Sequence, residues 1–210
     1  MVTANLALYK VLDLNQKKAV PMEAAQIPEF DSSELDPDDE RSQEFASVPY
    51  IFPELNILDA YSASILINVS TDSPIAVGFG ESRVEVAEIH KLSHFPPILL
   101  KIRLPDGYPT EKPPQMELES EWFPRIVKLK LEAEIYRRWR DTHDYVLYDT
   151  IDILQQEAKQ GFGLLDQEKE QDIALLLQRD LEERFVAFNK KTIKDIFNRG
   201  TYSCGVCLGM

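Results

Sequence analysis

The segment from Leu104 to Pro114 limits the possible folds more than any other part of this chain. It contains four prolines within ten residues, Pro105, Pro109, Pro113 and Pro114. Each proline fixes its own φ angle and lacks a backbone N–H, so the segment fits neither a helix interior nor the middle of a sheet. Tyr108 lies among them and offers an apolar ring whose hydroxyl can anchor the loop. We therefore expect a fixed loop between two regular elements.

The sequence on both sides of this loop has the patterns of β-strands. Residues 97–104 and 115–119 alternate apolar with charged or polar side chains, as half-buried strands do. Residues 62–70 are β-branched and apolar and are followed by the turn residues Asp72, Ser73 and Pro74. Residues 75–79 and 84–89 form a further strand region, broken by Gly78 and Gly80. These four regions predict a four-stranded sheet.

Helical patterns precede and follow the strands. Asp36 before Pro37 can cap a helix that carries Phe45 and Val48 inward and ends near Pro49 or Pro53. After the strands, apolar residues recur every four positions from 127 to 139, and Asp144 can cap a second helix that ends at Gly161 or Gly163. The order of helix, four strands and two helices predicts an α+β fold, with the helices on one face of an antiparallel sheet.

A third helical stretch is expected after Asp166, with its apolar side formed by Ile173, Leu177, Leu181, Phe185 and Phe188. Two interpretations of this amphipathic stretch remain open. It can pack on its own domain or on a neighbouring one, or it can form a coiled-coil interface with a partner.

Composition narrows the classes of partner and compartment. The net charge of −13 argues against nucleic acid or an anionic membrane as a general partner. The basic residues Lys128, Lys130, Arg137, Arg138 and Arg140 are an exception in this acidic chain, and they form either a solvated helix face or a site for an acidic partner segment. The only two cysteines lie too close together for a disulfide framework, which indicates a reducing compartment, the cytoplasm, with the nucleus as a second candidate.

The two cysteines, Cys204 and Cys207, form one C-x-x-C motif. This motif supplies two of the four ligands of a tetrahedral zinc ion. A thiol–disulfide exchange motif and a chance pair are the alternatives, and the first of these requires a strand before the motif and a helix after it. The histidines His90, His94 and His143 are interpreted as surface residues, because nothing pairs them with a nucleophile and Pro96-Pro97 opposes a metal-binding helix near the first two.

The loop Leu-Pro-Asp-Gly-Tyr-Pro, followed by Pro113-Pro114 and a short strand, resembles the RWD domain, a relative of the ubiquitin-conjugating fold. The resemblance implies a structural role for Pro105, Tyr108, Pro109, Pro113 and Pro114. Conjugating activity itself is excluded, because it requires a cysteine after the loop to carry ubiquitin as a thioester and residues 108–163 contain none.

An RWD-like region followed by Tyr202-Ser-Cys-Gly-Val-Cys resembles the N-terminal part of RING-between-RING (RBR) ubiquitin ligases. The resemblance divides the chain into a flexible acidic segment (1–39), an RWD domain (40–163), a helical linker (164–200) and the start of a truncated RING (201–210). It implies that Cys204 and Cys207 are the first two ligands of a zinc ion whose other ligands belong to a longer parent chain.

The same resemblance implies that the RWD domain docks substrates or regulators, on the translation machinery, while the missing RING recruits a ubiquitin-conjugating enzyme. The chain by itself is expected to catalyse nothing. A stand-alone RWD adaptor that binds protein partners without ubiquitin chemistry is the alternative.

Overall fold

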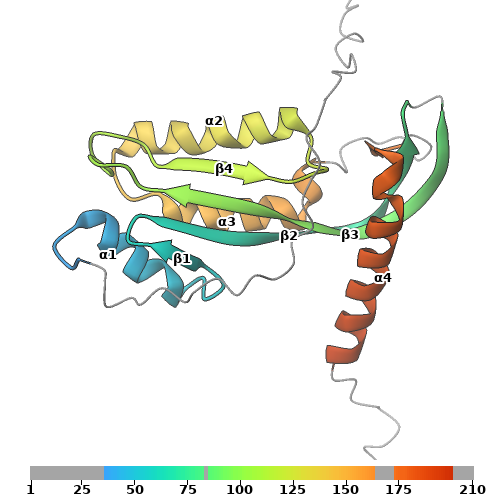
Figure 1. The fold of residues 1–210 in the computed structure, drawn as a ribbon, viewed down its shortest axis with the longest axis horizontal. Coiled ribbons are helices and arrows are strands. Elements are labelled where there is room, and N and C mark those ends of the chain that lie inside the picture. The colour runs from blue at the N-terminus through green and yellow to red at the C-terminus, as the bar shows by residue number, and fades with distance from the viewer. Residues whose placement is uncertain (1–35, 83–84, 164–172, 201–210) are drawn as a thin grey trace, which may run out of the picture.

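The structure is a computed structural model that describes residues 36–82, 85–163 and 173–200. Figure 1 shows its elements along the chain. The helices are α1 (Glu40–Ser47), α2 (Arg125–Thr142), α3 (Leu147–Lys159) and α4 (Glu182–Arg199), and the strands are β1 (Asn56–Asp59), β2 (Ser62–Gly80), β3 (Val86–Arg103), β4 (Gln115–Glu119) and β5 (Leu175–Leu177). Short 3-10 turns cover Val48–Tyr50, Gly161–Gly163 and Arg179–Leu181.

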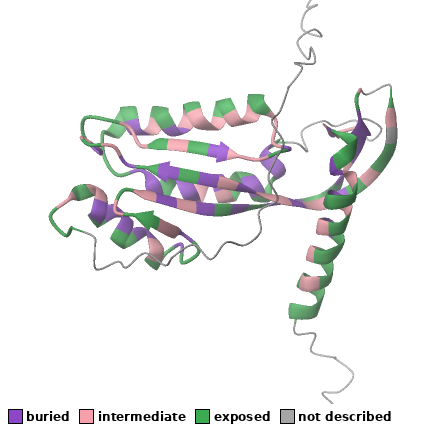
Figure 2. Cartoon of the chain, in the orientation of Figure 1, coloured by how far each residue is buried: buried purple, intermediate pink, exposed green. Residues whose placement is uncertain are grey.

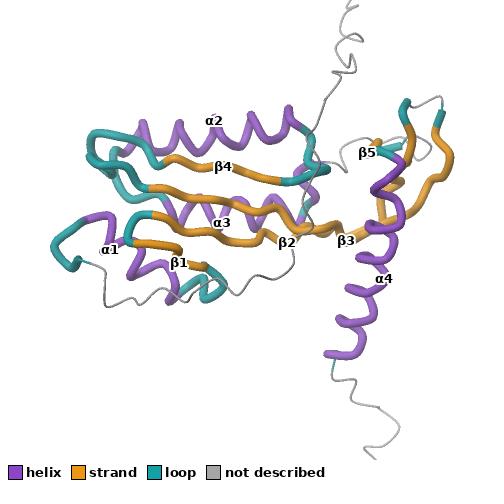
Figure 3. The backbone as a smooth tube through the Cα atoms, in the orientation of Figure 1, coloured by secondary structure: helices purple, strands orange, loops and turns teal. Residues whose placement is uncertain are grey.

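The sheet confirms the predicted α+β class. Strands β1, β2, β3 and β4 lie side by side in chain order, and each neighbouring pair is antiparallel. Strand β5 adds a short parallel pairing at the far end of β2, where Val77 lies opposite Leu175 (Figure 3). The helices α1, α2 and α3 cluster at one end of the long β2–β3 hairpin, and α4 crosses the hairpin at the other end (Figure 1).

The core lies between the sheet and these helices. Along β2, Ala63, Ile65, Ile67 and Val69 are buried while Leu66 and Asn68 between them are exposed, so one face of the sheet is covered and the other meets water (Figure 2). The covered face packs with Phe45 of α1, Ile151 of α3 and Trp139 of α2, each buried. The inward positions of Phe45 and Val48 are therefore confirmed.

The strands differ from the predicted ones in length and number. The two parts of the predicted strand region, 75–79 and 84–89, belong to different strands: the first continues β2 and the second begins β3. Strand β3 runs through Pro96 and Pro97, where the register shifts between Phe95 and Ile98, because proline is tolerated in a sheet at such a bulge. Strand β1 was not predicted. His90 and His94, which were interpreted as surface residues, lie within β3 and are half-buried.

The two predicted caps are also wrong. Helix α1 begins at Glu40 and is capped by Asp39, whose Oδ1 accepts a hydrogen bond from the N–H of Arg41 at 2.9 Å; Asp36 belongs to the preceding turn. Helix α3 begins at Leu147 and takes no cap from Asp144. Its first N–H instead donates to Glu44 of α1 at 2.9 Å, a partner supplied by tertiary contact.

The segment after Asp166 is not one helical stretch. Residues 164–172 lie outside the described residues, Leu175–Leu177 forms β5, and α4 starts only at Glu182. Three successive leucines fit a strand because the edge of β2 offers hydrogen-bonding partners there, and the N–H of Ala174 donates to the carbonyl of Ala76 at 2.9 Å. The helical prediction is therefore wrong for residues 175–177 and holds for 182–199.

Candidate docking surface

The proline loop is held by a buried network of hydrogen bonds. The hydroxyl of Tyr108 donates to Oε2 of Glu44 at 2.6 Å and accepts from the N–H of Val146 at 3.1 Å. The other carboxylate oxygen of Glu44 accepts from the N–H of Leu147. Burial raises the pKa of Glu44 and also the pKa of Tyr108. The network joins α1, the loop and the start of α3, so its role is to stabilise the fold.

The prolines place this loop against α2. The peptide bond between Tyr108 and Pro109 is cis, and the carbonyl of Pro109 accepts a hydrogen bond from the indole N–H of Trp139. Pro105, Pro113 and Pro114 are half-buried along the loop before β4. The loop thus sets where the last turns of α2 lie.

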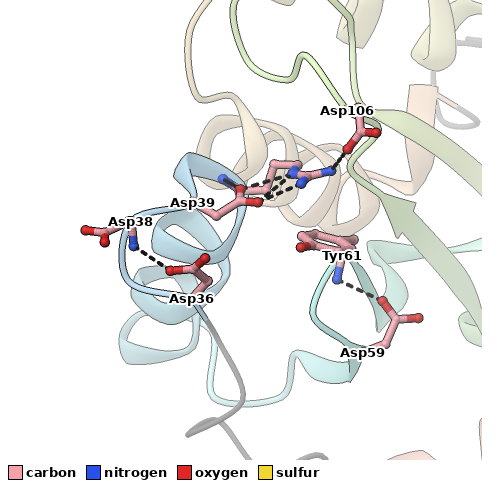
Figure 4. Close-up of polar contacts among 7 residues, drawn as sticks. Asp36, Asp38, Asp39, Asp59, Tyr61 and Asp106 are labelled. Atoms are coloured by element: carbon pink, nitrogen blue, oxygen red, sulfur yellow. Dashed lines mark hydrogen bonds and ion pairs between the residues drawn. The ribbon is translucent and has the colours of Figure 1, made fainter.

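Arg41 of α1 forms ion pairs that connect α1 to the same loop near the surface (Figure 4). Its guanidinium pairs with Asp39 at 2.6 Å, bonds to Asp106 of the loop and lies 3.9 Å from the ring centre of Tyr61. The hydrogen bond from Arg41 holds the pKa of Asp39 below its usual value. These contacts join α1 to the proline loop and to Tyr61 before β2, so this cluster has a structural role between elements.

Helix α2 has two apolar faces, and only one of them is covered. Ile135 and Trp139 point into the core. On the opposite side, Ile126, Leu129 and Tyr136 are each about half exposed, at 51%, 50% and 51%. With the exposed Ala133 they follow a spacing of three and four residues, which places them on one stripe of a helix. We call Ile126, Leu129, Ala133 and Tyr136 the α2 stripe; Figure 2 shows exposed residues along the outer side of this helix.

Basic side chains border the α2 stripe. The helix carries six basic residues against three acidic ones, although the whole chain has a net charge of −13. Arg137 pairs with Glu134 at 2.6 Å, and Arg138 shares the same carboxylate at 3.3 Å. Lys130 makes no ion pair within the described residues. The outer side of α2 therefore combines apolar area with positive charge, which suits a partner that is apolar and acidic.

A groove of about 1020 Å³ continues this surface at the N-terminal end of α2. Its apolar lining includes Leu118 of β4, Leu129 of α2 and Leu181 before α4, and Glu121 and Lys128 are among the charged residues of the lining. The groove and the α2 stripe share Leu129, so they form one continuous surface. Grooves that combine apolar walls with a few charged groups are typical binding sites.

Helix α4 is attached to β3 by polar and aromatic contacts. The side-chain oxygen of Asn189, which is 7% exposed, accepts from the N–H groups of Ser93 at 3.2 Å and His94 at 3.0 Å. Phe185 is 1% exposed, and its ring makes edge contacts with the rings of Phe79, Phe95 and Trp122. The first of the two open interpretations of this amphipathic stretch, packing on its own domain, is the one observed.

One of the three histidines, His90, contacts α4 directly. His90 is half-buried, and its Nε2 lies 3.0 Å from Glu182 of α4 and 3.3 Å from Glu88 of β3. Burial lowers the pKa of His94. His143 is exposed and ends α2 in a left-handed conformation at φ 51°. Sequence reasoning missed the contact of His90 with Glu182, because their 92-residue separation hides it.

The predicted metal ligands, Cys204 and Cys207, lie outside the described residues. None of the helices that the structure describes is long and apolar enough to cross a membrane.

Comparisons with known proteins agree with this fold. The model of the RWD domain family matches residues 39–158, more than half of the chain. An E3 ubiquitin-protein ligase of Schizosaccharomyces pombe, itt1, is 25% identical over 170 residues, which cover 79% of this chain and 38% of that ligase. The E3 ubiquitin-protein ligase RNF14 of Danio rerio is 29% identical over 76 residues, which cover 36% of this chain and 17% of that ligase. The chain thus spans well under half the length of these relatives, and no solved structure matches it.

Proposed function

This chain belongs to the RWD domain family, and from that premise we propose that it is the protein-docking region of an RBR-type ubiquitin ligase. The proposal is supported by two relatives that are both E3 ubiquitin-protein ligases, each much longer than the part matched here. In such a protein the ligase chemistry would lie in other parts of the polypeptide. This region would hold substrates or regulators near it, on the translation machinery, in the cytoplasm and also in the nucleus.

The main structural support for a docking role is the exposed outer side of α2. Leu129 and Tyr136 are half exposed, at 50% and 51%, on a helix whose buried residues are Ile135 and Trp139. An exposed apolar stripe edged by charges is the usual form of a helix-based interface, because apolar contacts supply affinity and charges supply specificity. The groove beside Leu129 extends the area available to a partner.

The C-x-x-C motif fits the start of a zinc module. Cysteine thiolates are good zinc ligands, and Cys204 and Cys207 would supply two of the four that a structural site needs. The other ligands would come from a longer protein, where zinc would fold the RING that recruits a ubiquitin-conjugating enzyme. A ligase cysteine would also be needed to carry ubiquitin as a thioester, since both cysteines of this sequence lie in the C-x-x-C.

The docking role is tested in the ligase that contains this region. We expect Leu129→Asp with Tyr136→Asp to abolish ubiquitin transfer to proteins of a ribosome-containing extract, while the ligase still modifies itself. Leu66→Asp is the matched control, because Leu66 is 47% exposed on the open face of β2 and is not part of the α2 stripe. Unchanged transfer to extract proteins would show that the α2 stripe docks nothing, and loss of self-modification would place this region in the catalytic step.

The ligase context is tested separately by reading the transcript beyond codon 210. An open frame with further Cys and His pairs would give Cys204 and Cys207 their missing partners. A stop codon would leave a stand-alone RWD adaptor, and the docking surface would then serve a protein without ubiquitin chemistry.

A further inference from the structure

We infer that the acidic segment at residues 22–35 of this same chain docks on the α2 stripe and competes with external partners for it. The segment contains Glu23, Glu29, Asp31 and Glu34 and no basic residue, and it carries Ile27, Phe30 and Leu35 as apolar side chains. These residues lie outside the described part of the chain. The contact itself does not depend on the proposed function; its consequence, self-inhibition of docking, does.

Charge and shape on α2 complement this segment. The α2 stripe offers apolar area from Ile126 to Tyr136, and Lys130 and Arg137 lie on its flank at exposed positions. Among the residues that the structure describes, Lys130 makes no ion pair, and Arg137 pairs only with acids of its own helix, at 2.6 Å to Glu134 and 3.8 Å to Asp141. A segment with acidic residues on either side of Phe30 would place its ring on the stripe and its carboxylates toward these cations.

The segment is attached to the described chain at the end of the molecule where α2 ends. The described chain begins at Asp36, which lines one surface pocket together with Tyr108 and Thr110 of the proline loop. The same loop contacts Trp139, in the last turns of α2. Figure 1 shows the start of α1 and the end of α2 at the same end of the sheet. Fourteen residues can span roughly 45 Å when extended, which exceeds the roughly 27 Å length of an 18-residue helix such as α2.

Covalent attachment makes even a weak contact effective. A short tether gives an effective concentration on the order of 1 mM, so a contact with a Kd of about 0.2 mM would be closed about five times as often as open. An external partner must displace the segment before it binds. Such a contact would also weaken with salt, because part of its free energy comes from exposed charges.

The test uses the intact 210-residue chain and the rate at which chymotrypsin cleaves after Phe30, followed by mass spectrometry. Docking shields this bond, so Lys130→Glu with Arg137→Glu should accelerate cleavage about sixfold at low salt. Lys190→Glu with Lys191→Glu on α4 is the matched control, since both lysines are exposed and the two substitutions change the net charge equally. The control should leave the rate unchanged.

A charge swap decides whether the contact is direct. Glu23→Lys with Glu34→Lys should also accelerate cleavage. Combining these two changes with Lys130→Glu and Arg137→Glu should restore opposite charges and slow cleavage again. Rates on isolated peptides of residues 22–36 correct for the altered sequence. The inference would be overturned if the wild-type chain and the Lys130→Glu/Arg137→Glu variant were cleaved at the same rate. It would also be overturned if the α4 control variant accelerated cleavage as much as the α2 variant does. A failed docking assay in the longer ligase would leave this result untouched, so the two proposals fail separately.

Discussion

Tyr108 donates its hydroxyl hydrogen to Oε2 of Glu44 at 2.6 Å, although 64 residues separate the two in the sequence. Glu44 comes from α1 and Tyr108 from the proline loop; Tyr108 also accepts from the N–H of Val146, just before α3, and Glu44 from that of Leu147, its first residue. One carboxylate and one hydroxyl therefore hold three parts of the chain together. Because the network is buried, each of its polar atoms depends on the others for a partner.

The first prediction concerns the hydroxyl of Tyr108. Tyr108→Phe keeps the ring but leaves the N–H of Val146 and the Glu44 carboxylate each short of one partner. We expect the free energy of unfolding to fall by about 1–3 kcal/mol, measured by urea denaturation followed by circular dichroism. Tyr148→Phe is the control, because Tyr148 is 46% exposed, and it should change stability little. Equal effects of both substitutions would contradict the role of the network.

The second prediction concerns pH. Burial raises the pKa of Glu44 in the folded state above its unfolded value of 4.5, so the folded state holds its proton over a pH range where the unfolded state has lost it. Stability from this group is therefore fully present below pH 4.5 and is lost as pH rises through the raised folded pKa.

Glu44→Gln removes this titration. The difference in unfolding free energy between the wild-type chain and the Glu44→Gln variant should shift in favour of the variant as pH rises from 4.5. Urea titrations at a series of pH values measure it. Parallel stability profiles would show that Glu44 does not titrate in this way.

The third prediction concerns the attachment of α4. Asn189→Leu leaves the N–H groups of Ser93 and His94 without their acceptor, which costs about 1–3 kcal/mol. Amide hydrogen exchange in α4 should become faster, because the helix separates more often from β3. Asn198→Leu on the same helix is exposed and should leave exchange in the first turns of α4 unchanged.

The fourth prediction separates an integrated helix from an independent linker. Phe185→Ala removes a ring that contacts Phe79, Phe95 and Trp122, and we expect it to lower global stability by about 3–5 kcal/mol. Phe188→Ala, at a half-buried position one turn away, should cost less. If Phe185→Ala melted α4 without moving the main unfolding transition, α4 would be a separate unit.

Much of the fold could be predicted from neighbouring residues. Apolar repeats every four residues indicated the helix with Ile135 and Trp139, and alternation indicated the strand at residues 115–119. The prolines around Tyr108 marked the loop. Each of these signals depends on residues within one or two turns of each other, which sequence patterns report well.

The caps and the long strands could not be predicted in this way. Asp144 has the right side chain for a cap, but Glu44 reaches Leu147 from another helix and takes that place. The turn residues at 72–74 were expected to end a strand, yet β2 continues past them because β3 supplies partners on the far side of the register shift.

The sequence by itself determined the element types, the rigid proline loop and the family resemblance, because side-chain period, proline geometry and the spacing of a motif are local properties. Only the tertiary structure decided that Leu175–Leu177 joins the sheet, that α4 is anchored through Asn189 and that one side of α2 stays exposed. The physical reason is that a leucine or an amide has the same local preferences wherever it lies. Which surface covers it, and which N–H it satisfies, depends on residues that are distant in the chain and meet only on folding.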